Sequence, residues 1–425
     1  MVSRERTLDN EICQSELLSP GQSWLDFSPP DRSVECVYIH VPFCAVKCHY
    51  CAFYSKEPDK KKIELYVDAI VREIQNASHS AKPRTIFFGG GTPSILPVKH
   101  LTKIFSAIQS AKWTEVEEWT VECNPATLNK DKVEVFKNFG VNRVSLGVQS
   151  MEPILLEKLG RIHTVDMVLK TFDLLRSSGF ENINLDLMFA IPGQTLEMWD
   201  QTLERILSLG SEHMSCYELI YEEDTPLFKS LQAGEIKPNE ELAEQMYLNL
   251  IEKLRANEFY QYEVANFARD ESRPSNNNIS FDESNPPIAF PKYACQHNLN
   301  YWLGGSYLGL GPSANGFING FRYQNVANTS RYCEMIDFQG EALEWKEKLS
   351  DSARAGEIAA FGFRTSYGWD LDKYYSLTGI RLEDNWGSSI KKFIHCGWME
   401  SSPGRIRLTP QGLRFADSVA LDFID

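Results

Sequence analysis

The sequence predicts an α/β fold built around a parallel sheet. Short apolar segments alternate with longer segments whose apolar residues recur at helical spacing, which is the pattern of strands joined by crossover helices. The chain has 425 residues, enough for two or three domains, and 43% of them are hydrophobic. The six expected strands fit either a partial (β/α) barrel or a doubly wound sheet, and in both architectures ligands bind at the carboxyl ends of the strands.

The expected strands are short, and each is followed by turn or loop residues. They cover Cys36–His40, Thr85–Phe88, Trp119–Cys123, Arg143–Gly147, Ile183–Met188 and Met214–Ile220. Apolar stripes at helical spacing predict four helices between them, over residues 63–74, 101–108, 165–175 and 199–207. Gly179 and Gly210 end the last two helices, because glycine readily adopts the left-handed conformation of a helix C-terminus.

Composition divides the rest of the chain into further segments. Residues 1–33 are polar and are expected to form a lead-in segment, followed by a core domain over 34–268. A polar, turn-rich stretch at 269–293 is expected to be a mobile loop or an insertion. Residues 294–425 are expected to form a second domain.

The end of the second domain has the element order of a winged-helix module. A helix is expected over Asn385–Cys396, followed by two strands around a turn at 403–404, the second over Arg405–Leu408. Thr409 and Pro410 then begin another helix, as its cap and its first residue. Because the chain is acidic, we expect this module to serve in packing rather than in DNA binding.

Charge and hydropathy exclude several classes of protein. The formal net charge of −15 argues against nucleic acid as a partner, because phosphate binding needs a basic face. No apolar run is long enough to span a bilayer, so no integral membrane segment is expected. Residues 1–10 mix basic and acidic side chains without an apolar stretch behind them, unlike a secretory signal, and we expect a cytoplasmic protein.

Three of the ten cysteines cluster directly after the first expected strand. Cys44, Cys48 and Cys51 form the pattern C-x-x-x-C-x-x-C, which lets one loop present three thiolates to a metal centre. A structural zinc site would need a fourth ligand, and His40 or His49 is near enough in sequence to supply it. An iron–sulfur cluster held by three cysteines would instead leave one iron open to a small molecule.

At these residues the chain resembles the radical S-adenosylmethionine superfamily, whose signature is this cysteine spacing. It resembles most closely the branch that contains oxygen-independent coproporphyrinogen III oxidase (HemN) and the heme chaperone HemW, from about Cys36 to the C-terminus. The resemblance implies a partial (β/α)6 barrel with a C-terminal α+β HemN-type domain. It also implies a 4Fe-4S cluster on Cys44, Cys48 and Cys51, with S-adenosylmethionine on the open iron and an electron donor as partner.

Further motifs agree in order and spacing with those that bind S-adenosylmethionine in this branch. Gly89-Gly90-Gly91-Thr92-Pro93 follows the second strand, where residues without a Cβ let the backbone approach a ligand closely. By resemblance, Tyr38, Gly90 and Glu122 bind the S-adenosylmethionine on the cluster. Positions that surround a second S-adenosylmethionine in the oxidase are matched by Tyr50, Gly91, Thr92, Gln149, Arg161, Asp186 and Ile220. Whether this chain binds a second molecule is left open.

Two features separate the members of the branch. The oxidase has a fourth cysteine two residues after the third, whereas this chain has Phe53, as in the HemW branch. The segment Cys295-Gln296-His297-Asn298-Leu299-Asn300-Tyr301 carries the His-Asn-x-x-Tyr pattern of HemW, and an imidazole is a good axial ligand for heme iron. The resemblance therefore implies a HemW-like heme chaperone that binds heme through His297 and delivers it to acceptor hemoproteins.

Three alternatives remain open from the sequence. The chain is expected to lack coproporphyrinogen III oxidase activity because of Phe53, but a decarboxylating oxidase remains the first rival. A radical methyltransferase of the same branch is the second, since it shares the three-cysteine core. A structural metal protein without radical chemistry is the third. Whether the chain is an enzyme at all is not decided by these motifs.

Overall fold

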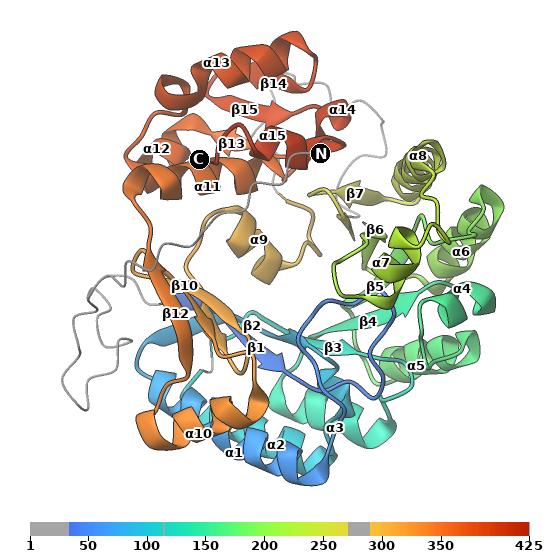
Figure 1. The fold of residues 1–425 in the computed structure, drawn as a ribbon, viewed down its shortest axis with the longest axis vertical. Helices are drawn as coiled ribbons and strands as arrows, with labels where there is room; N and C mark the ends of the chain where they lie inside the picture. Colours follow the sequence, from blue (N-terminus) through green and yellow to red (C-terminus); the bar gives the residue numbers. More distant parts are fainter. Residues whose placement is uncertain (1–33, 114, 271–289, 425) are drawn as a thin grey trace.

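The computed structural model describes residues 34–424, except residue 114 and residues 271–289. Its main sheet has the strand order β7-β8-β6-β5-β4-β3-β2-β1-β9 and curves into an open partial barrel (Figure 1). The six expected strands are present and parallel, as β1 (Val34–Val41), β2 (Ala81–Gly90), β3 (Glu118–Cys123), β4 (Arg143–Gln149), β5 (Ile183–Phe189) and β6 (His213–Glu218). The α/β class and the partial barrel are therefore confirmed.

The sixth strand ends earlier than the sequence predicts. We expected it to run to Ile220, but β6 ends at Glu218. Leu219 is buried in a small apolar cluster with Leu155 and Leu159, while the Ile220 side chain is 66% exposed. Leu219 therefore packs in a second apolar cluster and Ile220 lies on the exposed rim, and neither residue extends the strand.

Three further strands extend the sheet at its two edges. β9 (Leu308–Leu310) pairs in parallel with β1, although the two are far apart in sequence. At the other edge, β8 (Asn266–Arg269) pairs antiparallel with β6, and β7 (Phe259–Gln261) pairs antiparallel with β8. Residues from the expected second domain therefore complete the sheet of the expected core domain.

The crossover helices cover the outer face of the sheet (Figure 1). The four expected ones are α1 (Lys60–Ala77), α2 (Val98–Ser110), α5 (Val165–Ser177) and α6 (Leu196–Leu209). The sequence analysis did not identify the others, which are η2 (Pro93–Ile95), α3 (Lys130–Phe139), α4 (Pro153–Lys158), α7 (Pro226–Gln232) and α8 (Glu240–Ala256). Side-chain caps begin several of them, as at Asp59 before α1 and Thr164 before α5.

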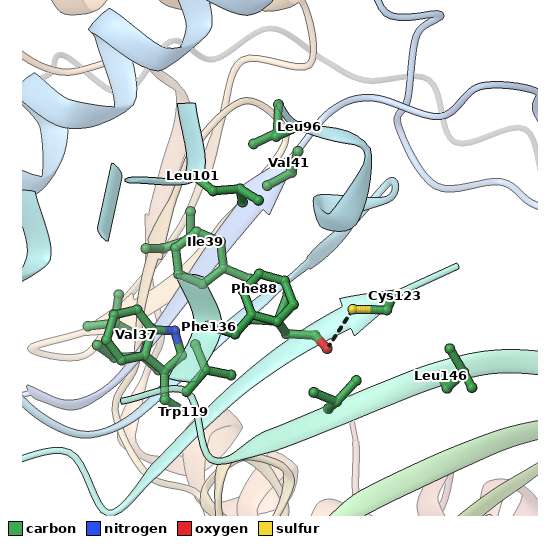
Figure 2. Packing of buried hydrophobic residues seen from close by; sticks show 14 of the residues in the cluster. Val37, Ile39, Val41, Phe88, Leu96, Leu101, Trp119, Cys123, Phe136 and Leu146 are labelled. Carbon is green, nitrogen blue, oxygen red and sulfur yellow. Dashed lines mark hydrogen bonds between the residues drawn. The ribbon is translucent and has the colours of Figure 1, made fainter. Parts of the chain in front are cut away.

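Alternation along each strand separates an apolar outer face from a polar inner face. Val37, Ile39 and Val41 of β1 point toward the helices, where they join one large hydrophobic cluster. Figure 2 shows Phe88 and Trp119 of the next two strands in the same layer. Because strand side chains alternate, the intervening residues face the inside of the barrel. That face carries Tyr38, His40, Thr85, Glu118, Thr120, Glu122, Arg143, Ser145, Asn184, Asp186, His213 and Ser215.

The segment after β9 packs against the main sheet. β10 (Asn315–Ile318), β11 (Phe321–Asn325) and β12 (Leu343–Lys348) form an antiparallel sheet, and α10 (Thr329–Gln339) lies beside α1 (Figure 1). The buried Glu73 carboxylate of α1 accepts hydrogen bonds from the Asn325 side chain at 2.9 Å and from the Tyr332 hydroxyl at 2.6 Å. These contacts join the segment to the core of the barrel.

A second hydrophobic cluster forms the C-terminal unit. Its elements are α11 (Asp351–Phe363), β13 (Trp369–Asp370), α12 (Leu371–Thr378), α13 (Leu382–His395), β14 (Met399–Ser402), β15 (Arg405–Leu408), α14 (Pro410–Leu413) and α15 (Ala416–Ala420). The expected helix–strand–turn–strand–helix order is present, with Thr409 capping α14 by accepting from the amide of Gly412 at 3.0 Å. The small sheet has the order β13-β15-β14.

This packing bears on the predicted division of the chain. The buried residues of the first cluster end at Ala342 and those of the second begin at Ala355, while the partly buried Val264 and Leu303 also pack against the second. We therefore propose a boundary near residue 350 in place of the predicted one at 294. The predicted lead-in, 1–33, and most of the predicted loop, 269–293, lie outside the described residues, which include only 269–270 and 290–293 of that loop. Within the described ranges, no helix combines the length and hydrophobicity needed to cross a membrane.

Candidate functional site

The cysteine loop leaves the carboxyl end of β1 and is fixed on several sides. The amide of Cys44 donates to the carbonyl of Lys56 at 3.1 Å, which closes the loop on itself. The amide of His49 donates to the carbonyl of Leu159 at 3.0 Å, and the carbonyl of His49 accepts from the amide of Leu227 at 3.0 Å. The loop therefore rests on the segments that follow β4 and β6, at the end of the barrel where ligands are expected.

The three loop cysteines have the chemistry that a cluster requires. All three are unpaired thiols and half-buried. Arg161 donates from Nη1 to Cys48 Sγ at 3.5 Å, and Cys44 Sγ lies 3.5 Å from Thr92 Oγ1. Burial raises the pKa of Cys51, and the neighbouring Cys48 and Cys44 thiols add to that rise. Three thiolates so close to one another need positive charge, and iron supplies it in a cluster.

The other buried cysteines differ from the loop cysteines. Burial raises the pKa of Cys36 and of Cys123 to about 12. Cys216 and Cys123 point into the hydrophobic cluster between sheet and helices. Buried thiols of this kind are inert, so they serve as controls for the loop cysteines.

The two histidines that could complete a structural zinc site differ in their hydrogen bonds. His40 is buried, its Nδ1 lies 3.1 Å from the Tyr38 hydroxyl, and its Nε2 lies 2.9 Å from the Tyr54 carbonyl. His49 Nδ1 is bonded to the Lys158 carbonyl at 2.9 Å. Among the residues described, no three His, Cys, Asp or Glu side chains converge on one metal position. A 4Fe-4S cluster does not need such convergence, because its thiolates bind different iron atoms.

The glycine segment packs against the cysteine loop. Gly90 has φ +99°, and a Cβ built on it would lie 2.5 Å from the His40 ring. A Cβ on Gly91 would lie 2.6 Å from the carbonyl oxygen of Phe43. The amides of Gly91 and Thr92 donate to the carbonyls of Val41 and Phe43 at 2.8 and 2.7 Å. The close approach that requires glycine is thus to the start of the cysteine loop.

Two half-buried carboxylates, Glu122 and Asp186, lie on the inner face near the glycine segment. Burial, with the neighbouring Asp186 carboxylate as second cause, raises the pKa of Glu122 to about 8. Burial also raises the pKa of Asp186, although Asn184 and Ser145 oppose this by donating hydrogen bonds to it. Within the described part of the chain neither carboxylate forms an ion pair, which favours a ligand that brings an ammonium group or hydroxyl donors. The methionine and ribose parts of S-adenosylmethionine carry these groups, so the residues fit it.

Arg161 joins the cysteine loop to the end of β4. Besides Cys48 it donates from Nη2 to the Gly147 carbonyl at 2.6 Å, and its buried Nε has no hydrogen-bond partner in the described part of the chain. Burial lowers the pKa of Arg161, but the neighbouring Tyr50, Cys48 and Asp186 side chains outweigh this effect and raise it overall. An unpaired buried N–H is costly, so this position also suits a ligand with an acceptor group.

Gln149 and Ile220 complete the account of the predicted site residues. Gln149 is 8% exposed and has φ +68°, a strained conformation for a residue with a side chain. Such strain often marks a functional position, and here it follows a bulge at the end of β4. Ile220 lies beyond β6 on the exposed rim of the barrel, and its side chain is apolar.

His297 lies inside the barrel on α9 (Gln296–Trp302), away from the cysteine loop. Its side chain is 1% exposed and stacks on Phe87 with ring centroids 5.1 Å apart. Nδ1 lies 2.7 Å from the Thr85 hydroxyl, and Nε2 lies 2.8 Å from the Tyr301 hydroxyl. Both ring nitrogens are occupied, so heme ligation would require at least one of these hydrogen bonds to break. The assignment of His297 to heme stays a prediction.

The other polar residues of the inner face were not among the predicted site residues. Arg143 is 2% exposed, makes one hydrogen bond, to the Thr120 hydroxyl at 3.5 Å, and leaves its Nε without a partner among the described residues. Glu118, Asn184 and His213 are likewise buried on this face. The signal was available, because polar residues occupy alternate positions of β3 at 118, 120 and 122.

The fold and the cysteine loop define a class of protein, and comparisons with known proteins agree. The family model of the radical SAM superfamily matches residues 38–206. The chain belongs to the radical S-adenosylmethionine superfamily, in the branch of HemN and HemW. It is 33% identical to heme chaperone HemW of Bacillus subtilis, over 90% of this chain and 97% of that protein. The corresponding values are 32%, 91% and 96% for HemW of Lactococcus lactis, and 29%, 90% and 96% for HemW of Escherichia coli.

A solved structure shows the same fold over nearly the whole chain. Coproporphyrinogen III oxidase (HemN) from Escherichia coli superposes with a TM-score of 0.76 and covers 94% of this chain and 92% of its own. The sequences are 19% identical. Membership of the superfamily implies a 4Fe-4S cluster and S-adenosylmethionine, and a cluster held by the three loop cysteines would supply the electron for cleavage of the sulfonium.

The assignment of the cluster ligands predicts the effect of cysteine replacements. Changing Cys44, Cys48 or Cys51 to Ser should abolish the absorption and paramagnetic spectra of a reconstituted 4Fe-4S cluster, because each removes one iron ligand. Cys123→Ser and Cys216→Ser should retain the cluster, since both thiols face the hydrophobic layer. Loss of the cluster in these controls, with retention in the loop variants, would contradict the assignment.

We expect the Glu122 carboxylate to contribute to cofactor binding. Glu122→Gln should weaken S-adenosylmethionine binding to the cluster-loaded protein by roughly 10- to 100-fold, the loss of one charge-assisted hydrogen bond. Calorimetry measures the affinity, and the cluster spectrum should not change. Glu117→Gln is the matched control, because that carboxylate lies on the surface in an ion pair with Arg84. Equal affinities in both variants would argue against Glu122 as a ligand.

Proposed function

We propose that the protein is a heme chaperone that holds a 4Fe-4S cluster on Cys44, Cys48 and Cys51, binds S-adenosylmethionine, and passes heme to acceptor hemoproteins. The main support is the similarity to proteins named heme chaperone HemW, which extends over about nine-tenths of this chain in three bacteria. The proposal places the protein in the cytoplasm. It also includes an electron donor among the partners, because the cluster must be reduced before it can donate an electron.

Phe53 is the observation that carries the choice within the branch. It stands where the oxidase is expected to have a fourth cysteine, and its side chain is 70% exposed on the cysteine loop. An exposed aromatic ring offers no thiol to a substrate, but it offers apolar surface to a flat macrocycle. The residue therefore supports heme binding near the loop over decarboxylation at it.

The predicted S-adenosylmethionine residues fall into two groups in this proposal. Gly90 and Glu122 lie at the carboxyl ends of β2 and β3, Tyr38 lies within β1, and all three would serve the molecule on the cluster. Of the residues assigned to a second molecule, Tyr50, Gln149 and Asp186 lie near the Arg161 side chain. Gly91 and Thr92 pack against the start of the cysteine loop, and Ile220 lies at the rim. The orphan Nε of Arg161 supports a ligand at this second position.

The proposal predicts heme binding without oxidase activity. Reconstituted under anaerobic conditions, the protein should bind added heme and show a Soret band. With reductant, S-adenosylmethionine and coproporphyrinogen III it should yield no protoporphyrinogen, while HemN from Escherichia coli serves as the positive control. Turnover at an enzyme's rate would establish the oxidase instead, and a methylated product would establish the methyltransferase. Absence of heme binding would contradict the proposal that the protein is a heme chaperone.

Heme ligation by His297 has its own test. His297→Ala should shift or abolish the Soret band of added heme, or weaken heme binding at least about tenfold, and should spare the cluster. Cys295→Ser is the control, because Cys295 is fully buried, its thiol donates to Glu118 at 3.3 Å, and burial raises its pKa. Its replacement should have the smaller effect. Identical heme spectra with and without His297 would show that another residue binds the iron.

A further inference from the structure

A chain of largely buried hydrogen bonds crosses the inner face of the sheet and extends beyond the residues assigned to S-adenosylmethionine. It begins at the Asp186 carboxylate, which accepts from Asn184 Nδ2 at 2.7 Å and from the Ser145 hydroxyl at 3.1 Å. The Asn184 Oδ1 lies 2.6 Å from His213 Nδ1, and His213 Nε2 lies 2.8 Å from the Tyr262 hydroxyl. His213 and Tyr262 are both 0% exposed.

The partners in this chain fix the direction of every bond. The amide nitrogen of Asn184 faces a carboxylate, which only accepts, so its oxygen faces His213. Nδ1 of His213 therefore carries the proton, and burial keeps the ring neutral by lowering its pKa. Nε2 must then accept from the Tyr262 hydroxyl. One rotamer and one tautomer satisfy all of these groups, so the chain is rigid.

Tyr262 carries the chain to two other parts of the molecule. Its hydroxyl accepts from the amide of Cys295, the N-terminal cap of α9, at 3.2 Å. Its carbonyl accepts from the amide of Ser366 in the C-terminal unit at 3.0 Å. Tyr262 thus contacts the cofactor face of the barrel through His213, the helix of His297 directly, and the C-terminal unit through its backbone.

The start of α9 has a second attachment, at β3. The Glu118 carboxylate accepts from the amides of Gln296 and His297 at 2.9 and 3.0 Å. Both attachments act on the first turn of α9, whose amides lack partners within the helix. The position of α9 therefore depends on the inner face of the sheet.

We propose that Tyr262 and His213 are positioning residues that couple the S-adenosylmethionine site at Asp186 to α9, the helix that carries His297. The proposal rests on the proposed function, which assigns S-adenosylmethionine to Asp186. A ligand that displaces or holds Asp186 acts on Asn184, His213 and Tyr262 in turn, because none of them can reorient without breaking a hydrogen bond. By linkage, a change at α9 alters the affinity for S-adenosylmethionine by the same factor as the reverse effect.

The test removes a single atom from the chain. Tyr262→Phe deletes the hydroxyl and leaves the ring, which separates His213 from the amide of Cys295. Two measurements on the cluster-loaded protein report the coupling: the affinity for S-adenosylmethionine by calorimetry, and hydrogen exchange of the α9 amides with and without S-adenosylmethionine. Tyr374→Phe is the matched control, a buried tyrosine of the C-terminal unit whose hydroxyl donates to the Ala355 carbonyl at 2.9 Å.

The expected result is a loss of communication and not a loss of fold. In the wild type and in Tyr374→Phe, S-adenosylmethionine should slow exchange at α9 about fivefold or more. In Tyr262→Phe that slowing should disappear, and the affinity should fall several-fold. Should Tyr262→Phe not fold, His213→Asn breaks the same chain one residue earlier, and it should show the same loss.

The outcomes separate this coupling from the proposed function. A wild type that binds S-adenosylmethionine without any change at α9 overturns the coupling alone. The same holds if Tyr262→Phe keeps the full effect, since the hydroxyl is then not part of the connection. A wild type that does not bind S-adenosylmethionine overturns the proposed function, and the coupling with it.

Discussion

The position of β1 is the constraint on which the rest of the molecule depends. β1 pairs with β2 on one side and with β9 on the other, so residues from both halves of the chain hold it. Its end is crowded, because the His40 carbonyl accepts from the Tyr66 hydroxyl at 2.9 Å and a Cβ on Gly311 would lie 2.5 Å from the same oxygen. Glycines at 90, 91 and 311 are required for this approach, and the cysteine loop continues from it.

The electrostatics of the barrel interior follow from that arrangement. Parallel strands bring polar residues into layers on one face, and water cannot reach most of them. Burial and the neighbouring Asp186 carboxylate raise the pKa of Glu122, while Arg143 lies nearby with few hydrogen bonds. Leaving such groups unsatisfied costs free energy, so the interior is organised for a ligand that carries both positive and negative groups. The amino and carboxylate groups of a methionine moiety have this character.

The sequence predicts the parts of the fold that local patterns encode. The six parallel strands are short apolar runs followed by turns, and Thr409 with Pro410 marks a helix start by its chemistry alone. β9 was missed because three residues containing Gly309 show no periodicity, and its place beside β1 is set by a contact across the whole chain. The boundary at 294 was drawn from composition, which does not report that 308–343 packs on α1 and β1.

The candidate site divides in the same way. The cysteine spacing and the carboxylates at strand ends are visible in the sequence, because each lies within one segment. The surroundings of His297 are not, since Thr85 and Glu118, which hold its ring and its amide, precede it by about two hundred positions. The polar inner-face residues are an intermediate case. Their alternation in β3 is visible in the sequence, but the sequence alone does not show which face of the sheet the helices cover.

Because His297 is buried, the proposed coupling between the S-adenosylmethionine site and α9 bears on heme binding. An iron ligand must have a free nitrogen, whereas the Thr85 and Tyr301 hydroxyls occupy both, and stacking on Phe87 covers one face of the ring. Each hydrogen bond contributes about 0.5–1.5 kcal/mol, which an iron–imidazole bond can replace, but the porphyrin also needs room that α9 fills in this conformation. Heme binding at His297 therefore requires α9 to move. Since Glu118 and Tyr262 hold the start of α9, the energy of that movement is set on the inner face of the barrel, where S-adenosylmethionine is proposed to bind.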